Sequence, residues 1–257
     1  LESGATYTLD ISKVLSVDGF TADNSVSFTA KSDVFLNVDF ETMNTTGEEF
    51  GISRETAAGG SYLDEPSYNE EEKALAATRE VTQDDHYYSR GALMYGSIGD
   101  VDSLSLSGNV VFEAKMKFDM MDQDLIYWPL AFSPVATDNE WMGWFSKDGF
   151  KVTQGKCYVD DEYLCDIDVN KYYTFRVSAS IDGDTETTDT MLCTVTDENG
   201  VLYTAKAVLD TEAGDMNANA MDSIKAVSIV RYNFGADKVY APEEKVFATT
   251  YIKSING

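Results

Sequence analysis

The chain has 257 residues, of which 45 are acidic and 19 are basic, which gives a formal net charge of −26 and a pI near 4.1. Nucleic acids and anionic membranes are bound through clustered lysines and arginines, and the sequence contains no such cluster, so both are excluded as partners. The same charge disfavours long anionic polysaccharides unless Ca²⁺ bridges the charges, and it favours a soluble monomer.

The length predicts one large domain over residues 1–257, because about 75 % of the unfolded surface is buried at this size. No apolar run reaches the length of about 18 residues that a membrane span needs. The chain begins at Leu1 without a methionine or a signal peptide. We therefore expect a fragment of a larger protein, with the targeting segment and other domains elsewhere.

Alternation of apolar and polar residues predicts a succession of short β-strands. Near the N-terminus the pattern covers residues 7–14, 25–30 and 34–40, and residues 1–38 are expected either to precede the main sandwich or to join it. The clearest case is residues 110–119, whose even-numbered positions up to 118 are apolar while charged residues dominate the odd-numbered positions. This is the pattern of a half-buried antiparallel strand.

Further strands are predicted at residues 173–181, 191–196, 201–209, 224–232 and 245–253. Asn199-Gly200 between two of them is a strong hairpin signal. More than ten short strands with turn residues between them are typical of an all-β antiparallel sandwich. Residues 70–79 (EEEKALAATR) are rich in helix formers and predict one short helix.

Four segments share a pattern with a known group of domains. They are Val38-Asp39-Phe40-Glu41, residues 110–118 after Gly91-Ala92-Leu93, residues 170–182 followed by Thr194-Val195-Thr196-Asp197, and residues 248–256. Together they resemble the concanavalin-A-like, laminin-G-like jelly rolls of secreted bacterial polysaccharide-degrading proteins. The likeness covers about four fifths of the chain. It implies a sugar-binding module more often than an enzyme.

Two positions depart from that pattern. Tyr172 stands where a tryptophan is usual, and Lys253-Ser254-Ile255 replaces an acidic closing strand. The second departure counts against a calcium site of the family type at the chain ends. A structural Ca²⁺ is still an expectation, with Asp39 and Glu41 as weak candidate ligands, because carboxylate oxygens are the ligands that calcium prefers.

Residues 127–145 contain all three tryptophans of the chain and no lysine or arginine. Flat apolar rings stack on sugar faces, so Tyr127, Trp128, Trp141 and Trp144 are candidate ligand-binding residues. If residues 140–145 form a strand, Trp141 and Trp144 point to opposite faces, so one would be core and the other exposed. The alternative is that all three tryptophans belong to the core.

Polar residues near these rings are candidates for hydrogen bonds to sugar hydroxyls. They are Asp138, Asn139, Glu140 and Gln154. Their alternative is a solvated loop, since such residues are mostly exposed.

Catalytic signatures are weak. Hydrolases of the concanavalin-like fold carry E-x-D-x-x-E on one strand, and that spacing is absent. His86 is the only histidine, so Ser-His-Asp chemistry would depend on it alone.

The cysteines are Cys157, Cys165 and Cys193, an odd number that excludes a disulfide framework. A hairpin turning near Asp161 would place Cys157 opposite Cys165 and allow one disulfide. Three free thiols are the alternative.

The sequence therefore predicts a non-catalytic carbohydrate-binding module rather than an enzyme. It would hold a secreted or cell-surface multidomain protein on a neutral polysaccharide such as starch, another glucan or a hemicellulose. Two alternatives are kept: a structural or adhesive cell-surface module, and a glycoside hydrolase or polysaccharide lyase.

Overall fold

The computed structural model describes residues 6–10, 14–15, 21–22, 25–29, 36–54, 64–80, 91–95, 104–121, 125–133, 149–182, 189–209, 223–234 and 247–257. The chain divides into two compact units, Leu1–Phe35 and Leu36–Gly257. In the first unit, β1 (Thr6–Asp10) pairs with β4 (Ser25–Thr29) and β2 (Val14–Leu15) pairs with β3 (Thr21–Ala22). A single domain over residues 1–257 stays a prediction.

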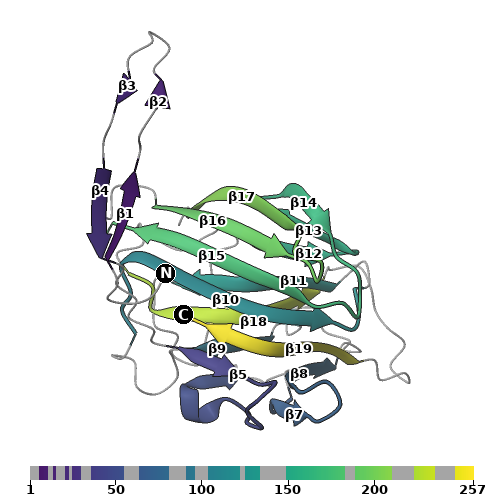
Figure 1. Ribbon diagram of the computed structural model, residues 1–257. Coiled ribbons are helices and arrows are strands. Elements are labelled where there is room, and N and C mark those ends of the chain that lie inside the picture. The colour runs from purple at the N-terminus through teal and green to yellow at the C-terminus, as the bar shows by residue number, and fades with distance from the viewer. Residues whose placement is uncertain are drawn as a thin grey trace. The chain divides into compact units, whose positions relative to one another are not determined.

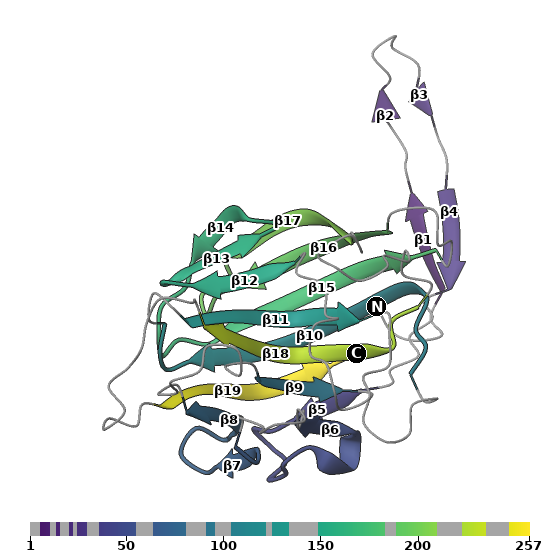
Figure 2. The same ribbon diagram turned by 180° about the vertical axis from the view of Figure 1, so that it is seen from behind.

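The second unit is an antiparallel sandwich of two sheets, which lie one behind the other in Figures 1 and 2. The described residues of the larger sheet form, in spatial order, β17 (Leu202–Leu209), β16 (Asp189–Thr196), β15 (Tyr173–Ile181), β10 (Gly108–Phe118), β19 (Phe247–Asn256), β8 (Ala74–Glu80) and β7 (Ser67–Asn69), and β5 (Asn37–Asp39) also pairs with β19.

The smaller sheet is built in the same antiparallel way. Its described strands are, in spatial order, β14 (Glu162–Asp166), β13 (Lys156–Val159), β12 (Phe150–Thr153), β11 (Leu125–Ser133), β18 (Ala226–Phe234), β9 (Gly91–Tyr95) and β6 (Ile52–Arg54). A single 3₁₀ turn, η1 (Glu48–Phe50), precedes β6. The predicted all-β antiparallel sandwich of the jelly-roll type is confirmed.

The alternation predicted for residues 110–119 is present in β10. Phe112 and Ala114 are buried, while Val111 and Lys115 lie on the outer face. The neighbouring strand β15 alternates buried and partly or fully exposed residues along its whole length, and Phe112 lies directly opposite Val177. Each of these strands therefore supplies one row to the core and one row to the outer face of the larger sheet.

Aromatic rings from both sheets meet in the core. Phe112 of the larger sheet contacts Phe132 of the smaller one with ring centroids 5.7 Å apart. Phe175 of β15 meets Phe150 of β12 edge to face at 5.2 Å. Such tilted and edge contacts stabilise an aromatic pair beyond its buried area. The rings therefore fix how the two sheets face each other.

The short helix predicted for residues 70–79 is wrong. Residues 70–73 form a turn, in which Lys73 has a positive φ of 49°, and the following residues form strand β8. The strand pairs with β19 along its length, and Leu75 and Ala77 are fully buried in the core. Strand pairing and burial outweigh the helix propensity of these residues, which is only a few tenths of a kcal/mol each.

The Asn199-Gly200 hairpin is confirmed between β16 and β17. Gly200 has a φ of 78°, a conformation that suits glycine. The Asp197 carboxylate accepts hydrogen bonds from the backbone N–H groups of Asn199 and Val201 at 2.9 and 2.8 Å. The turn is thus held by its own side chain.

Removing a core ring should destabilise the sandwich strongly. Phe175→Ala leaves a cavity between the sheets and is expected to lower the free energy of unfolding by about 3–5 kcal/mol. Urea denaturation measures it. Leu202→Ala is the control, because Leu202 is 61 % exposed on β17 and should change stability by about 0.5 kcal/mol or less. Equal losses in both variants would contradict the placement of Phe175 in the core.

Candidate functional site

Two of the predicted stacking residues lie in strand β11 and are buried. Tyr127 is fully buried, its ring packs against Phe118 at 4.5 Å, and its hydroxyl donates to the carbonyl oxygen of Met120. Trp128 is 7 % exposed. A sugar can stack only on a ring that solvent reaches, so neither residue offers the exposed platform that the sequence predicted.

Of the other predicted ligand-binding residues, Gln154 is the one that the structure describes. Gln154 is exposed in the turn between β12 and β13. Trp141, Trp144 and Asn139 lie outside the described residues, as do Asp138 and Glu140, so their roles stay predictions.

The candidate calcium ligands already have partners. The Asp39 carboxylate accepts hydrogen bonds from the backbone N–H of Glu41 at 3.0 Å and from the Thr42 hydroxyl at 3.1 Å. Glu41 is bound by two lysines, whose charge would repel a metal ion. No group of three metal-binding side chains occurs within the described ranges. These two acids therefore fit a calcium ion poorly, and a structural Ca²⁺ stays a prediction.

A different group of side chains converges on the outer face of the larger sheet. We call it the lysine–tyrosine cluster, and its members are Lys115, Lys117, Lys253, Tyr172, Tyr251, Glu41 and Glu72. In contrast to the chain as a whole, with its net charge of −26, the cluster has three cations against two anions.

Strand register brings the members together. Lys115 and Lys117 alternate outward on β10, and Lys117 lies directly opposite Tyr251 of β19. Tyr172 immediately precedes β15, the strand on the other side of β10. Of the two acids, Glu41 follows β5 and Glu72 belongs to the β7–β8 turn.

Lys117 is the most enclosed cation of the cluster. Its side chain is 7 % exposed, and its Nζ lies 2.6 Å from a carboxylate oxygen of Glu72. The same Nζ lies 4.7 Å from the ring centroid of Tyr251 and 5.2 Å from that of Tyr172. Both distances are within the range of a cation–π contact, so the two tyrosine rings flank one ammonium group.

Lys253 and Lys115 hold the second acid. Lys253 Nζ is 2.7 Å and Lys115 Nζ is 3.7 Å from the Glu41 carboxylate. Lys253 Nζ is also 4.6 Å from the ring centroid of Tyr172. Tyr172 is therefore in cation–π contact with Lys253 as well as with Lys117.

The protonation states follow from these contacts. The Tyr172 hydroxyl donates to Glu72 at 2.9 Å, and burial together with this bond raises the pKa of Tyr172. The hydrogen bond from Lys117 lowers the pKa of Glu72, and the one from Lys253 lowers the pKa of Glu41. Burial raises the pKa of Tyr251. At neutral pH both acids are ionised and both tyrosines carry their protons.

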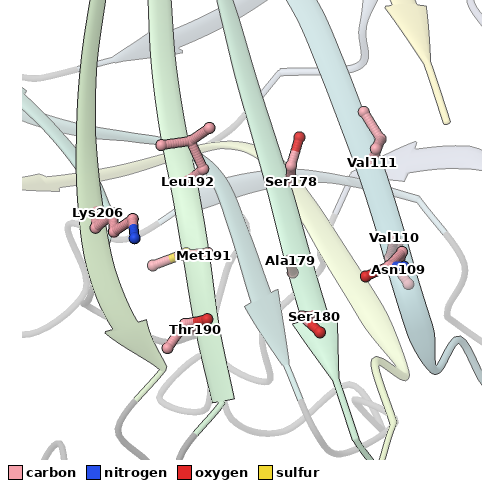
Figure 3. A pocket seen from close by; sticks show the side chains of 10 residues that line it. All are labelled: Asn109, Val110, Val111, Ser178, Ala179, Ser180, Thr190, Met191, Leu192 and Lys206. Carbon is pink, nitrogen blue, oxygen red and sulfur yellow. The ribbon is translucent and has the colours of Figure 1, made fainter. Parts of the chain in front are cut away.

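A shallow pocket lies on the same outer face, at the other end of β10 and β15 (Figure 3). Its volume is about 250 Å³, and ten residues of four adjacent strands line it. Ser178 and Ser180 lie on β15 between the larger Val111 of β10 and Leu192 of β16. Because these serines are small, the sheet surface is hollowed between its neighbours.

Lys206 of β17 completes the pocket on the side of Leu192, its cross-strand neighbour. Lys206 is exposed, and it has no ion pair or hydrogen bond with any other described residue. Strand β10 connects the pocket to the cluster: Val111 and Lys117 are six positions apart, which corresponds to roughly 20 Å at the rise of a strand. The face thus offers two separate positions for negative charge.

The comparisons with known proteins concern the fold. No protein-family profile matches the chain, and no curated protein matches it. A protein of unknown function from Shewanella oneidensis MR-1 is similar in structure, with a TM-score of 0.50, 10 % identity, and coverage of 86 % of this chain and 83 % of the other. At this identity the likeness shows the β-sandwich fold.

Two further solved structures are similar at lower scores. One belongs to work on endo-acting O-glycanases with which the human gut microbiota initiates mucin breakdown (TM-score 0.49, 10 % identity, 87 % of this chain and 98 % of the other). Another is the marine alginate lyase of Aplysia kurodai (TM-score 0.47, 9 % identity, 87 % of this chain and 99 % of the other).

The prediction of a non-catalytic binding module, and with it that the chain is not an enzyme, is corrected. Its support was an exposed aromatic platform, and burial removes Tyr127 and Trp128 from that role. The enzyme alternative is left, and it depends on the residues of the outer face.

Sequence reasoning missed the cluster but noted three of its members, one of them Glu41 as a candidate calcium ligand. Tyr172 and Lys253 are the two departures from the jelly-roll pattern, and the structure places them in contact. The outward alternation of Lys115 and Lys117 was also visible. What joins these residues is pairing between strands that are distant in sequence, which no local pattern reports.

Among the described residues, no helix is long and apolar enough to cross a membrane.

Removing Glu72 should leave the enclosed ammonium of Lys117 without its partner. Glu72→Gln is expected to lower the free energy of unfolding at pH 7 by about 1–3 kcal/mol. Because folding lowers the pKa of Glu72 from its usual 4.5, this stabilisation is present above that value and is lost as the pH falls through the lowered pKa. Urea denaturation at pH 7 and near pH 3 measures the difference, which should narrow in acid.

Glu71→Gln is the matched control, because Glu71 is an exposed neighbour in the same turn. It should leave stability within about 0.5 kcal/mol of the unchanged protein. A Glu72 variant as stable as this control at pH 7 would show that the ion pair contributes nothing.

Proposed function

We propose that the protein is a polysaccharide lyase, which cleaves a uronate-containing polysaccharide by β-elimination at the lysine–tyrosine cluster. The observation that carries the proposal is the pair of lysines, Lys117 and Lys253, in contact with the ring of Tyr172, whose hydroxyl is bonded to an ionised glutamate. Such a polymer is found outside cells, so a secreted or cell-surface location is part of the proposal.

The lysines would bind the carboxylate of the sugar. The C5 hydrogen of a uronate is next to this carboxylate, and its removal leaves negative charge that spreads onto the carboxylate oxygens. Ammonium groups fixed around those oxygens stabilise the charge as it develops. Lys253 is the best placed to take a substrate carboxylate, because its present partner Glu41 lies at the exposed side of the cluster.

The tyrosines would move the protons. Tyr172 Oη accepts the C5 proton while its own hydroxyl proton passes to Glu72, with which it is already hydrogen-bonded. The electron pair of the C5–H bond forms the C4=C5 double bond, and the C4–O4 bond breaks. Tyr251, which is protonated because burial raises its pKa, donates a proton to O4. The proton on Glu72 returns to Tyr251 through solvent.

Hydrolysis by paired carboxyls fits the cluster less well. A glycoside hydrolase needs one carboxyl group with a raised pKa as its general acid. The pKa values of Glu41 and Glu72 are both lowered by lysines, so neither keeps a proton at neutral pH. Elimination needs no such acid, because a tyrosine hydroxyl can protonate the leaving oxygen.

The net charge of the chain does not prevent an anionic substrate from binding. Exposed charges are screened over roughly 8 Å at physiological ionic strength. The cluster itself holds three lysines and two acids. The acidic charge of more distant parts of the chain is therefore largely screened at the cluster, where the lysines act on a bound carboxylate directly.

The pocket of Figure 3 would hold a distant part of the same polymer. Lys206 would pair with a second carboxylate, and the hydroxyls of Ser178 and Ser180 would bond to those of the sugar. The separation of roughly 20 Å along β10 requires several sugar units between the two positions. Long chains should therefore bind better than short ones.

The first test is Tyr172→Phe, which removes the hydroxyl and keeps the ring. We expect the rate of elimination to fall at least ~100-fold, the size of a general acid–base contribution. A panel of uronate polymers is incubated with protein, and the ultraviolet absorbance of the new C4=C5 bond is followed. Tyr163→Phe, on an exposed tyrosine of β14 outside the cluster, should retain full activity.

Two outcomes would count against the lyase. One is equal activity in the Tyr172 and Tyr163 variants. The other is release of new reducing ends, from any polysaccharide, without the absorbance of a double bond, since that would indicate hydrolysis.

The second test concerns the pocket. Lys206→Gln is expected to raise KM several-fold for long polymers and to leave kcat unchanged, because the pocket would bind substrate without touching the reacting bond. Lys156→Gln, on an exposed lysine of β13, is the matched control. A fall in kcat without a change in KM, or an equal effect of both variants, would contradict binding at the pocket.

A further inference from the structure

Two of the three cysteines face each other across one hairpin. Strands β13 and β14 turn at Asp160 and Asp161, which have positive φ values of 51° and 61°. A shift in register between Cys157 and Tyr158 then places Cys157 directly opposite Cys165, so the predicted hairpin near Asp161 does bring the two cysteines together. All three cysteines are free and buried.

The geometry of the pair suits a covalent bond. Residues directly opposite each other in an antiparallel pair have Cα atoms about 4.5–5.5 Å apart, and disulfides need about 4.4–6.8 Å. Cys157 and Cys165 both belong to the core cluster, so their side chains lie on the same face of the hairpin. The Cys157 thiol donates its hydrogen bond to the backbone carbonyl oxygen of Tyr158 at 3.8 Å.

We propose that Cys157 and Cys165 form a reversible disulfide by exchange with an external disulfide, either a small molecule or a protein of the thiol–disulfide class. The proposal stands on the strand register and is independent of the lyase activity. Within the described residues no third metal-binding side chain joins the two cysteines, so the pair lacks the ligands of a metal site.

The exchange proceeds in two balanced steps. The Cys165 thiolate attacks one sulfur of the external disulfide, forms a mixed disulfide and releases the other sulfur as a thiolate. Cys157, after losing its proton, attacks Cys165 Sγ, closes the internal bond and releases the second external thiolate. The two cysteines lose two electrons and two protons, and the external disulfide gains the two electrons.

The order of attack follows from the surroundings of the two thiols. The neighbouring Cys157 thiol lowers the pKa of Cys165, while the neighbouring Cys165 thiol and burial raise the pKa of Cys157. Cys165 therefore ionises first and is the nucleophile. It belongs to β14, the edge strand of the smaller sheet, whose local opening exposes it to reagents.

Cys193 is excluded from this bond. It lies on β16 of the larger sheet, and packed sheets are about 10 Å apart, which is beyond the reach of a disulfide at about 7 Å. Burial raises the pKa of Cys193 to about 12, so it stays a thiol. The third cysteine is therefore a natural internal control.

The test is refolding at equilibrium, which avoids the barrier of burial. The denatured protein is refolded in mixtures of glutathione and glutathione disulfide. Acid then stops the exchange between thiols and disulfides, and the remaining thiols are counted in denaturant. We expect the count to fall from three to one in the oxidising mixtures. Peptide mapping should show Cys157 joined to Cys165, and the oxidised protein should melt about 5 °C higher.

Two variants make the outcome decisive. Cys193→Ala should still lose two thiols and show the same rise in melting temperature. Cys165→Ala should form no internal disulfide and show no rise. Three thiols in the folded protein at every glutathione ratio, or a bond that includes Cys193, would overturn the proposal.

Discussion

The structure depends on the position of β10 between β15 and β19. Because a strand turns successive side chains to opposite faces, β10 must supply the core and the outer surface at the same time. Its inward row contains Phe112 and Phe118, which contact rings of the smaller sheet. Its outward row ends in Lys115 and Lys117. A shift of one residue in register would bury these lysines and expose the rings, so the core fixes the cluster.

The cluster in turn fixes two segments outside the central strands. Glu41 follows β5 and Glu72 belongs to the β7–β8 turn, and each is bound by a lysine of β10 or β19. Enclosed ion pairs contribute little net stability against an apolar alternative, but removing one partner is costly. These pairs are therefore better understood as fixing position than as the source of stability.

The fold was predictable because its signals are local. The alternation of β10 and β15, and the turn at Asn199-Gly200, are each contained in about ten residues of sequence. The helix predicted for residues 70–79 failed because a local propensity was outweighed by pairing with β19, which lies far along the chain. Composition alone cannot report such a partner.

The site was less predictable for a related reason. The aromatic segment was conspicuous in the sequence, yet Tyr127 and Trp128 are buried, because a ring that is suitable for stacking on sugar is equally suitable for a core. The lysines were inconspicuous because Lys117 and Lys253 are far apart in a chain dominated by acids. A net charge describes the average surface, whereas recognition depends on the few charges that the sheet gathers at one place.

The Glu41 carboxylate, held by Lys253 and Lys115, has a consequence for selectivity. Any ligand that reaches these lysines must first displace an internal anion that is tethered next to them. A neutral sugar offers no charge in exchange and leaves the internal pair intact, whereas a uronate replaces one carboxylate with another. Glu41 thus competes with any ligand for these two lysines, so a ligand needs a negative charge of its own to take its place.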